Sequence, residues 1–342
     1  MRDNFCPLVS IITPTYNHER FIGSCIETVL RQTHPNWEQI IIDDGSTDHT
    51  ADMVRSYSDR RIKYCFQENQ GIDALSQTYN RALSLAKGDL IAVLEGDDLW
   101  PADKLATLVP KFCDPSLVLA YGAVVDVDVN GRKQSGRRRT HKSRPNLPSS
   151  VLSNNPVWSA SRFMLTAQGP SLIPASTVVL RRSALEEIGG FQSFPGLRTT
   201  DYPTYFRLSL KGKFFYENRV MGFQRRHLGS VTITNLESGH LNASRCSRAF
   251  MQEYGRELSL TPADVTEIED SWKKSRTLIE FSLGRVSLLN KDWRRARTHF
   301  GATLRTGDPQ VRLASTAGLV LSWLHLNLEA VMQHFGRASL KK

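Results

Sequence analysis

The sequence predicts an α/β fold with a mostly parallel sheet in its first two thirds, followed by an all-helical extension. Two observations support this fold class. In the first 113 residues, short continuous apolar runs alternate with helical patterns, which is typical of parallel strands covered by helices on both faces. From about residue 236 onward only helical periodicity remains. We therefore expect two domains, residues 1–235 and 236–342.

Four buried strands are expected in the first hundred residues, each followed by a helix. The expected strands are 9–13, 39–42, 62–66 and 90–94, and the expected helices are 19–32, 51–57, 72–86 and 102–113. Ser46 or Thr47 can cap the second helix, and Lys87-Gly88 is a stop signal for the third. The sequence contains no GxGxxG or GxxxxGK(S/T) loop, so neither an ordinary dinucleotide site nor a P-loop is expected.

The pattern changes after residue 113. Residues 117–129 are apolar and then alternate up to Asn130-Gly131, which is a hairpin signal. Further strands are expected at 175–180, 214–216 and 222–227, and helices at 183–188 and 200–211.

The helical extension has two features of its own. Residues 278–304 suit a helical hairpin that is broken at 290–292. Residues 313–332 are the one candidate membrane segment, but Trp323, His325 and other polar or charged residues argue against a span. We expect a helix buried against its neighbour, and a helix lying on a bilayer surface is the alternative.

The bulk composition is that of a soluble globular protein with a net charge of +10. Residues 132–144 hold much of this charge, and we interpret them as a solvated loop. They lack interleaved aromatic residues, so no nucleic-acid partner is expected, whereas an anionic membrane surface or a phosphate-bearing substrate fits at least as well. Five cysteines without metal-ligand spacing and the absence of a signal peptide favour a cytoplasmic location. Peripheral contact with the inner face of the cytoplasmic membrane stays open.

An acidic motif follows the fourth expected strand. It contains three carboxylates, Glu95, Asp97 and Asp98, at the edge of the sheet where open α/β folds bind ligands. Carboxylates this close repel one another unless a cation lies among them, and hard divalent cations take oxygen ligands. The motif predicts a Mg²⁺ or Mn²⁺ site, and a solvated acidic turn is the alternative.

Further motifs occur in a fixed order along the first 230 residues. They lie at 9–17, 41–48, 69–71, 80, 88–89, 94–100, 189–191, 201 and 226–227. In order and spacing they resemble the family 2 glycosyltransferases, which have the GT-A fold, a Rossmann-like nucleotide-diphospho-sugar transferase fold with a mostly parallel mixed sheet. The resemblance implies transfer of a sugar from a nucleotide-diphosphate donor, such as a UDP-sugar, to an acceptor hydroxyl with inversion. The implied setting is the biosynthesis of cell-envelope polysaccharide, lipopolysaccharide or glycolipid.

The resemblance also implies a donor site. It places nucleotide contacts at the ends of the first two strands, at Pro14, Thr15, Tyr16 and Asp43. The Tyr16 ring can lie against a nucleobase, and Asp43 can accept a hydrogen bond from a base N–H or a ribose hydroxyl. Asn17 is a further candidate.

Two other segments contribute to this implied site. Gln70 and Gly71 open a helix, where backbone N–H groups favour an anion. Arg226 and His227 are candidates for a position near the diphosphate, although a structural histidine is an equally good interpretation.

The resemblance assigns a metal to the acidic motif, which is the DXD motif of the family. Asp97 matches the metal-binding position, and Asp98 either joins it as a ligand, orients Asp97 or meets the donor sugar. Glu95 and Gly96 complete the donor contacts, with Glu95 where the family usually has Asp. The metal offsets charge on the departing nucleotide diphosphate.

Asp201 matches the general base that takes the proton of the acceptor hydroxyl. The segment departs from the family pattern at Thr200, where a Glu is frequent, and at Pro203. No Gln-x-x-Arg-Trp motif is present, which favours one sugar per encounter. The expected acceptor is a saccharide or a lipid-linked saccharide. A non-catalytic sugar-nucleotide-binding or scaffold protein is the alternative, because Glu95, Thr200 and Pro203 depart from the pattern.

Overall fold

The computed structural model describes residues 6–139, 147–227, 236–305 and 309–326. The chain forms two compact units, Met1–Leu258 and Ser259–Lys342. The first unit contains the sheet and the second is helical in its described residues. None of the described helices combines the length and the apolar run that crossing a bilayer requires.

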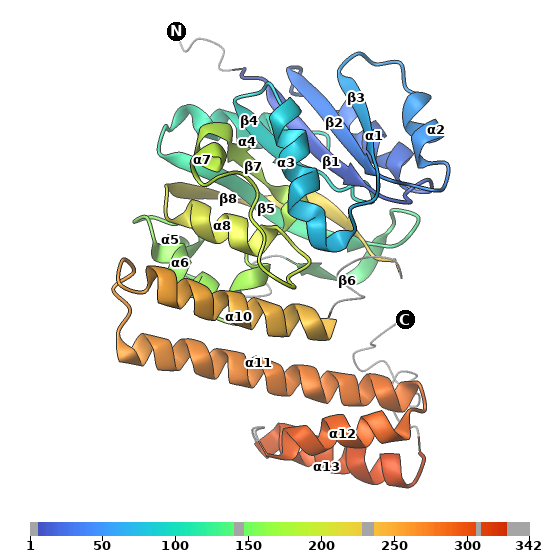
Figure 1. Ribbon diagram of the computed structural model, residues 1–342, viewed down its shortest axis with the longest axis vertical. Helices are drawn as coiled ribbons and strands as arrows, with labels where there is room; N and C mark the ends of the chain where they lie inside the picture. Colours follow the sequence, from blue (N-terminus) through green and yellow to red (C-terminus); the bar gives the residue numbers. More distant parts are fainter. Residues whose placement is uncertain (1–5, 140–146, 228–235, 306–308, 327–342) are drawn as a thin grey trace. The chain divides into compact units, whose positions relative to one another are not determined.

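The described strands of the first unit form one mixed sheet, in the order β3-β2-β1-β4-β7-β5-β6, with β8 paired to β5 (Figure 1). The strands are β1 Val9–Thr15, β2 Trp37–Asp44, β3 Ile62–Gln67, β4 Leu90–Val93, β5 Leu117–Val127, β6 Lys133–Arg139, β7 Val179–Arg181 and β8 Lys213–Arg225. The pairs β1–β2, β1–β4, β2–β3 and β5–β8 are parallel. β7 is antiparallel to β4 and β5, and β6 is antiparallel to β5. The predicted mostly parallel α/β sheet is thus confirmed.

Helices cover the sheet because its inner strands are apolar on both faces. Ile11 and Ile12 of β1 are both fully buried, although their side chains point to opposite faces. The helices of the first unit are α1 Ile22–Leu30, α2 Thr50–Arg55, α3 Leu75–Leu85, α4 Lys104–Leu108, α5 Ser149–Ser153, α6 Ser159–Leu165, α7 Arg182–Glu187, α8 Asp201–Ser209 and α10 Leu236–Tyr254. Short 3₁₀ turns lie at η1 Ile72–Ala74, η2 Val109–Cys113, η4 Gly169–Ser171 and η5 Ala175–Thr177.

Several local predictions were wrong, including the strand expected at 175–180, where η5 occupies 175–177 and β7 begins only at Val179. Neither Ser46 nor Thr47 caps α2, which begins at Thr50, and the Ser46 hydroxyl accepts a hydrogen bond from the Asn17 amide. The Thr50 amide donates to the Asp48 carboxylate at 3.0 Å instead. The two short strands expected at 214–216 and 222–227 are one strand, β8. Part of the basic segment is not a loop, since β6 pairs with β5 after the Asn130-Gly131 turn. Lys142 and Arg144 of that segment lie outside the described residues.

The helix α10 packs within the first unit. The Phe250 ring stacks on the Phe206 ring of α8, with ring centroids 4.2 Å apart and an angle of 6° between the rings. The Ser247 hydroxyl donates to the carbonyl oxygen of Leu165 in α6 at 2.5 Å. By packing, α10 therefore belongs with the sheet, although the expected division at residue 235 separates them. As a boundary between functional domains, residue 235 stays a prediction.

The second unit contains α11 Pro262–Leu289, α12 Trp293–Leu304 and α13 Pro309–Trp323. A capping box starts α11, because the Asp264 amide donates to the Thr261 hydroxyl and the Thr261 amide donates to Asp264. Lys291 turns the chain with a φ of 59°, and the Asp292 carboxylate then accepts the Arg295 amide at the start of α12. The predicted helical hairpin with a break at 290–292 is confirmed.

Candidate functional site

The ends of three parallel strands form the edge that carries the candidate site. Thr15 of β1 and Asp43 of β2 are register partners, and both are buried. The amide of Gly96 donates to the carbonyl oxygen of Pro14 at 3.1 Å, which brings the acidic motif beside the end of β1. Tyr16 follows with 46% of its surface exposed. The structure therefore brings together three of the predicted segments, 14–16, 43 and 95–98.

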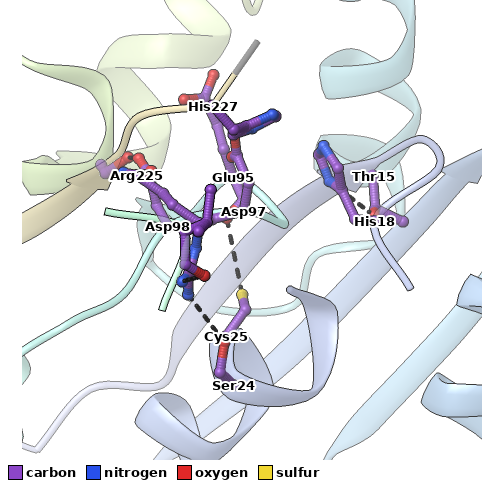
Figure 2. Close-up of polar contacts among 11 residues, drawn as sticks. Thr15, His18, Ser24, Cys25, Glu95, Asp97, Asp98, Arg225 and His227 are labelled. Carbon is purple, nitrogen blue, oxygen red and sulfur yellow. Dashed lines mark hydrogen bonds and ion pairs between the residues drawn. The ribbon is translucent and has the colours of Figure 1, made fainter. Parts of the chain in front are cut away.

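Gly96 is required by this close approach. A Cβ atom at position 96 would lie 2.6 Å from the Thr15 hydroxyl oxygen and 2.8 Å from Nδ1 of His18. Thr15 and His18 are themselves hydrogen-bonded at 3.1 Å, so neither can move freely (Figure 2). The glycine of the acidic motif thus lets the motif pack against the first strand.

The carboxylate of Asp98 is held by protein donors. Oδ1 accepts the Arg225 amide at 2.9 Å, and the Ser176 hydroxyl donates to Oδ2. Burial raises the pKa of Asp98 well above its ordinary value, and the nearby charge of Asp97 raises it further. These contacts hold Asp98 in place, and its possible roles in orienting Asp97, contacting the donor sugar or binding the metal stay predictions.

Arg225 joins the acidic motif to neighbouring residues by hydrogen bonds. It was not singled out from the sequence. Its Nε donates to the carbonyl oxygen of Asp97 at 2.7 Å, and its guanidinium also reaches the Ser24 hydroxyl at 3.0 Å (Figure 2). The guanidinium lies 4.8 Å from the centre of the Phe21 ring. The motif at 226–227 was recognised, but the preceding arginine, which also contacts the acidic motif, was not.

Asp97 lies between two histidines. Its Oδ2 is hydrogen-bonded to Nε2 of His227 at 2.9 Å. One ligand atom from each of His18, Asp97 and His227 lies within 4.8 Å of the others, and the same holds for Glu95, Asp97 and Asp98. Both sets share Asp97, so its oxygen and the imidazole nitrogens together fit a divalent cation such as Mn²⁺.

The surroundings of Asp97 and His18 shift the pKa values of both groups. Burial alone would raise the pKa of Asp97, but the hydrogen bond from His227 and the charge of His18 lower it below its ordinary value. Burial lowers the pKa of His18. A neutral imidazole beside an ionised carboxylate is the form in which both groups bind a metal. Sequence reasoning missed His18, although it directly follows the motif at 9–17.

Glu95 connects the acidic motif to α3 and to the expected base. Its Oε1 accepts the Tyr79 hydroxyl at 3.2 Å. Burial raises the pKa of Glu95 well above its ordinary value, and the charges of Asp98, Asp201 and Asp97 add to this rise. Asp201 is therefore close enough to the motif to interact with it electrostatically.

Asp201 is the first residue of α8, and its amide donates to the Thr199 hydroxyl at 3.3 Å. Burial raises the pKa of Asp201 to about 7. Pro203 falls in the first turn of the helix, where an amide hydrogen has no intrahelical partner to lose. The unusual proline is thus accommodated without distorting α8.

The region predicted to bind the nucleotide lies at the end of β2, and nucleotide binding there stays a prediction. The Asp43 carboxylate accepts the Ser46 amide at 2.9 Å and the Tyr64 hydroxyl at 2.7 Å. Phe66, the register partner of Asp43 on β3, is half exposed. Tyr64 and Phe66 were not singled out from the sequence, because their closeness to Asp43 depends on the pairing of β2 with β3.

Two predicted positions lie differently from the expectation. Gln70 and Gly71 do not open an α-helix, since a short 3₁₀ turn follows them and α3 begins at Leu75. Their amides donate to Asp44 at 3.1 Å and Asn69 at 2.8 Å. The Asp44 and Asn69 side chains thus accept the amide hydrogen bonds that were expected to bind an anion.

The remaining candidates have protein partners. Asn17 adopts a φ of 52° and accepts the Thr47 amide at 2.8 Å, which joins the loops after β1 and β2. The guanidinium of Arg226 pairs with Asp126 at 3.1 Å. A place near the diphosphate stays a prediction for Arg226.

Residues 10–189 match the sequence profile described as glycosyl transferase family 2. The chain is 36% identical over 234 residues to an uncharacterized glycosyltransferase of Haemophilus influenzae, covering 67% of this chain and 82% of that protein. It is 30% identical over 226 residues to the Escherichia coli UDP-Glc:alpha-D-GlcNAc-diphosphoundecaprenol beta-1,3-glucosyltransferase WfaP, covering 66% and 80%. To WfgD, a protein of the same description and organism, it is 40% identical over 115 residues, or 34% of this chain. The match spans 45% of WfgD, and for several other relatives it spans about half of their length.

Two solved structures share the fold. The mannosyltransferase PcManGT from Pyrobaculum calidifontis, in complex with GDP-Man and Mn²⁺, superposes with a TM-score of 0.54 at 18% identity over 98% of this chain and 89% of that chain. Residues 1–349 of S. aureus TarS in complex with UDP-GlcNAc give a TM-score of 0.50 at 18% identity over 95% and 92%. At this level of identity the likeness concerns the fold alone.

Proposed function

The chain belongs to glycosyl transferase family 2, and we propose that it transfers a sugar from a nucleotide-diphosphate donor to an acceptor hydroxyl with inversion. Its fold is the GT-A fold expected from the resemblance. One observation carries the proposal: the acidic motif at 95–98 lies beside the end of β1, and Asp201, from a distant part of the chain, is near enough for its charge to raise the pKa of Glu95. This arrangement supports a donor site and a base that face the same reacting centre.

In this proposal Asp97 holds a divalent cation, Mg²⁺ or Mn²⁺, with Asp98 beside it. The oxygen and nitrogen donors within 4.8 Å of one another fit such an ion. When bound, the cation supplies positive charge to the donor's diphosphate. Arg225 fixes the Asp97 backbone, and Gly96 lets the motif pack closely against the end of β1.

Asp201 is the proposed general base. Its carboxylate takes the proton of the acceptor hydroxyl while that oxygen forms a bond to the anomeric carbon, and the bond from this carbon to the diphosphate breaks. A pKa of about 7 keeps a useful fraction of Asp201 ionised near neutral pH. The attack comes from the side opposite the leaving group, so the configuration inverts.

The proposed substrates are a UDP-sugar or related nucleotide sugar and a saccharide or lipid-linked saccharide acceptor. The names of WfaP and WfgD describe glucosyl transfer from UDP-Glc to a diphosphoundecaprenol-linked sugar, which supports this class of acceptor. We place the reaction in cell-envelope polysaccharide, lipopolysaccharide or glycolipid biosynthesis, at the cytoplasmic face of the membrane. Tyr16, Asp43 and the neighbouring strand ends are the proposed nucleotide contacts.

The test is release of nucleoside diphosphate from a panel of nucleotide sugars, with Mn²⁺, with Mg²⁺ and with a chelator. We expect turnover with one donor and a metal, and its loss in Asp97→Ala and Asp201→Asn. Asp103→Asn is the matched control, because Asp103 is a surface carboxylate paired with Arg219. Unchanged rates in both site variants would reject these assignments. Donor binding by calorimetry without turnover on any acceptor would support the non-catalytic alternative.

A further inference from the structure

Helix α13 buries small residues and exposes several large apolar ones, while Leu319 is partly buried against the cluster that contains Phe300. Ser315, Gly318 and Ser322 are buried, whereas Leu313 is 75% exposed and Val320 is 52% exposed. In the usual amphipathic helix the large apolar side chains face the core, whereas α13 also carries such side chains on its exposed side. Exposed apolar side chains gathered on one face point to a second surface that they meet.

The packed side of α13 is already complete. A Cβ atom on Gly318 would lie 2.6 Å from the Phe300 ring of α12, so the two helices approach each other at a residue without a side chain. The hydroxyls of Thr303 and Ser315 are hydrogen-bonded across the same contact at 2.5 Å.

The opposite side of α13 forms an apolar stripe. Leu313, Ala317, Val320 and Leu324 recur at intervals of four, three and four residues, which places them on one face of a helix. All four are exposed, and Trp323 beside them is 70% exposed. We call these five residues the apolar stripe.

Two arginines, Arg297 and Arg312, adjoin this stripe, and the surrounding sequence is basic. Between residues 285 and 312 the sequence has seven Arg or Lys residues and two Asp residues. Asp292 caps α12 through the Arg295 amide. Arg297 donates to the carbonyl oxygen of Ser322 at 3.1 Å, and its guanidinium lies 4.4 Å from the centre of the Trp323 ring. Arg312 is exposed next to Leu313.

Apolar side chains with a basic margin are typical of helices that lie in the surface of an anionic bilayer. The excess of positive charge opposes pairing of this region with the same region of a second copy. We propose that the apolar stripe docks the chain on an anionic lipid surface. The proposal rests on the proposed function in one respect, since a lipid-linked acceptor requires the enzyme at a membrane.

The test uses the full chain and vesicles of phosphatidylcholine alone or mixed with an equal amount of phosphatidylglycerol. We expect sedimentation with the anionic vesicles, weakening as salt is raised. The double variant Leu313→Asn/Val320→Asn should lower the vesicle affinity by about tenfold or more, because both side chains leave the lipid. Leu278→Asn is the matched control, because Leu278 is 54% exposed on α11 but lies outside the apolar stripe.

Vesicle binding that is absent, or unchanged in the double variant, would overturn the proposal. If the wild type binds no vesicles, two further outcomes in the double variant would indicate another occupant of the apolar stripe. A change from dimer to monomer in light scattering would indicate a second copy of the chain. A fall in melting temperature would indicate that the stripe packs within the chain. Nucleoside-diphosphate release from the donor is measured on the same samples. Its absence together with intact vesicle binding would reject the proposed function and leave lipid docking standing.

Discussion

The side-chain amide of Asn80 forms two hydrogen bonds with the backbone of Phe191, 111 residues further along the chain. Nδ2 donates to the carbonyl oxygen at 2.9 Å, and Oδ1 accepts the amide at 2.7 Å. The next amide, that of Gln192, donates to the Thr204 hydroxyl in α8, the helix that Asp201 starts. Tyr79, the neighbour of Asn80 on α3, donates to Glu95. Helix α3 thus connects the acidic motif to the segment that positions the proposed base.

Asn80→Ala is expected to lower kcat more than it changes the donor KM. The substitution leaves two backbone groups near Phe191 without their partner, which costs about 1–3 kcal/mol of stability and lets the segment before α8 shift. Steady-state kinetics and thermal unfolding measure the two effects. Gln77→Ala, an exposed position on the same helix, is the control and should change neither. An unaltered kcat in Asn80→Ala would contradict the positioning role.

Turnover should rise with pH through about 7, because Asp201 must lose its proton to act as the base. The pH profile of kcat measures this rise. The residual kcat of Asp201→Asn should not show this rise with pH. A profile that is flat between pH 6 and pH 8, a range chosen to span about 7, would exclude Asp201 as the base.

The same pKa predicts an effect on stability. Because burial raises the folded pKa of Asp201 to about 7 from an unfolded value of about 3.9, the folded state holds the proton more tightly. The stability that this proton confers is present at low pH and is lost as the pH rises through about 7. Asp201→Asn should therefore melt above wild type at high pH, and the difference should shrink as the pH falls towards about 4. The melting temperature of Asp103→Asn should not diverge from that of wild type with pH in this way. If Asp201→Asn differs from wild type by the same melting temperature at all pH values, the raised pKa of Asp201 is contradicted.

Gly96→Ala should remove most of the activity. The new methyl group would lie 2.6 Å from the Thr15 hydroxyl and 2.8 Å from His18, so the motif must move away from β1. We expect at least about a tenfold loss in kcat/KM, since small displacements of positioning groups cost this much or more. Gly301→Ala in α12 is the control, because nothing lies within 4 Å of its Cβ position. It should stabilise the helix by up to about 1 kcal/mol.

The packing of α10 predicts where the chain can be shortened. Phe250→Ala removes the ring that stacks on Phe206 and should destabilise the first unit by about 3–5 kcal/mol. Leu241→Ala, at an exposed position of the same helix, should change the free energy of unfolding by no more than about 0.5 kcal/mol. A chain ending at Leu258 should fold, whereas one ending at residue 235 should lose cooperative unfolding. Equal thermal unfolding of the two shortened chains would show that α10 is dispensable.

The parts of the fold that follow from local pattern could be predicted. The continuous apolar runs at β1, β2 and β4 and the helical stripes between them specify a parallel sheet by themselves. The acidic motif could be placed at the sheet edge because it directly follows β4. Its glycine is explained only by the structure, since the crowding comes from Thr15 and His18.

The contacts that hold the site could not be predicted, because they depend on pairing between distant strands. Arg225 reaches Asp98 because β8 pairs in parallel with β5, and no local pattern specifies that partner. Tyr64 reaches Asp43 through the β2–β3 pairing. The basic residues 133–139 have a composition typical of a loop, but the turn at 130–131 pairs them with an apolar strand.

The bonds from Ser176 and Arg225 to Asp98 also bear on how the protein is made. A ribosome synthesises the acidic motif more than a hundred residues before it reaches Arg225. Until β8 emerges, the nascent chain has the carboxylates and Ser176 but not the Arg225 amide that also holds Asp98. A chain that stops before β8 therefore carries the acidic motif with only one of these two donors, and Asp98 is held by both only after β8 has been made.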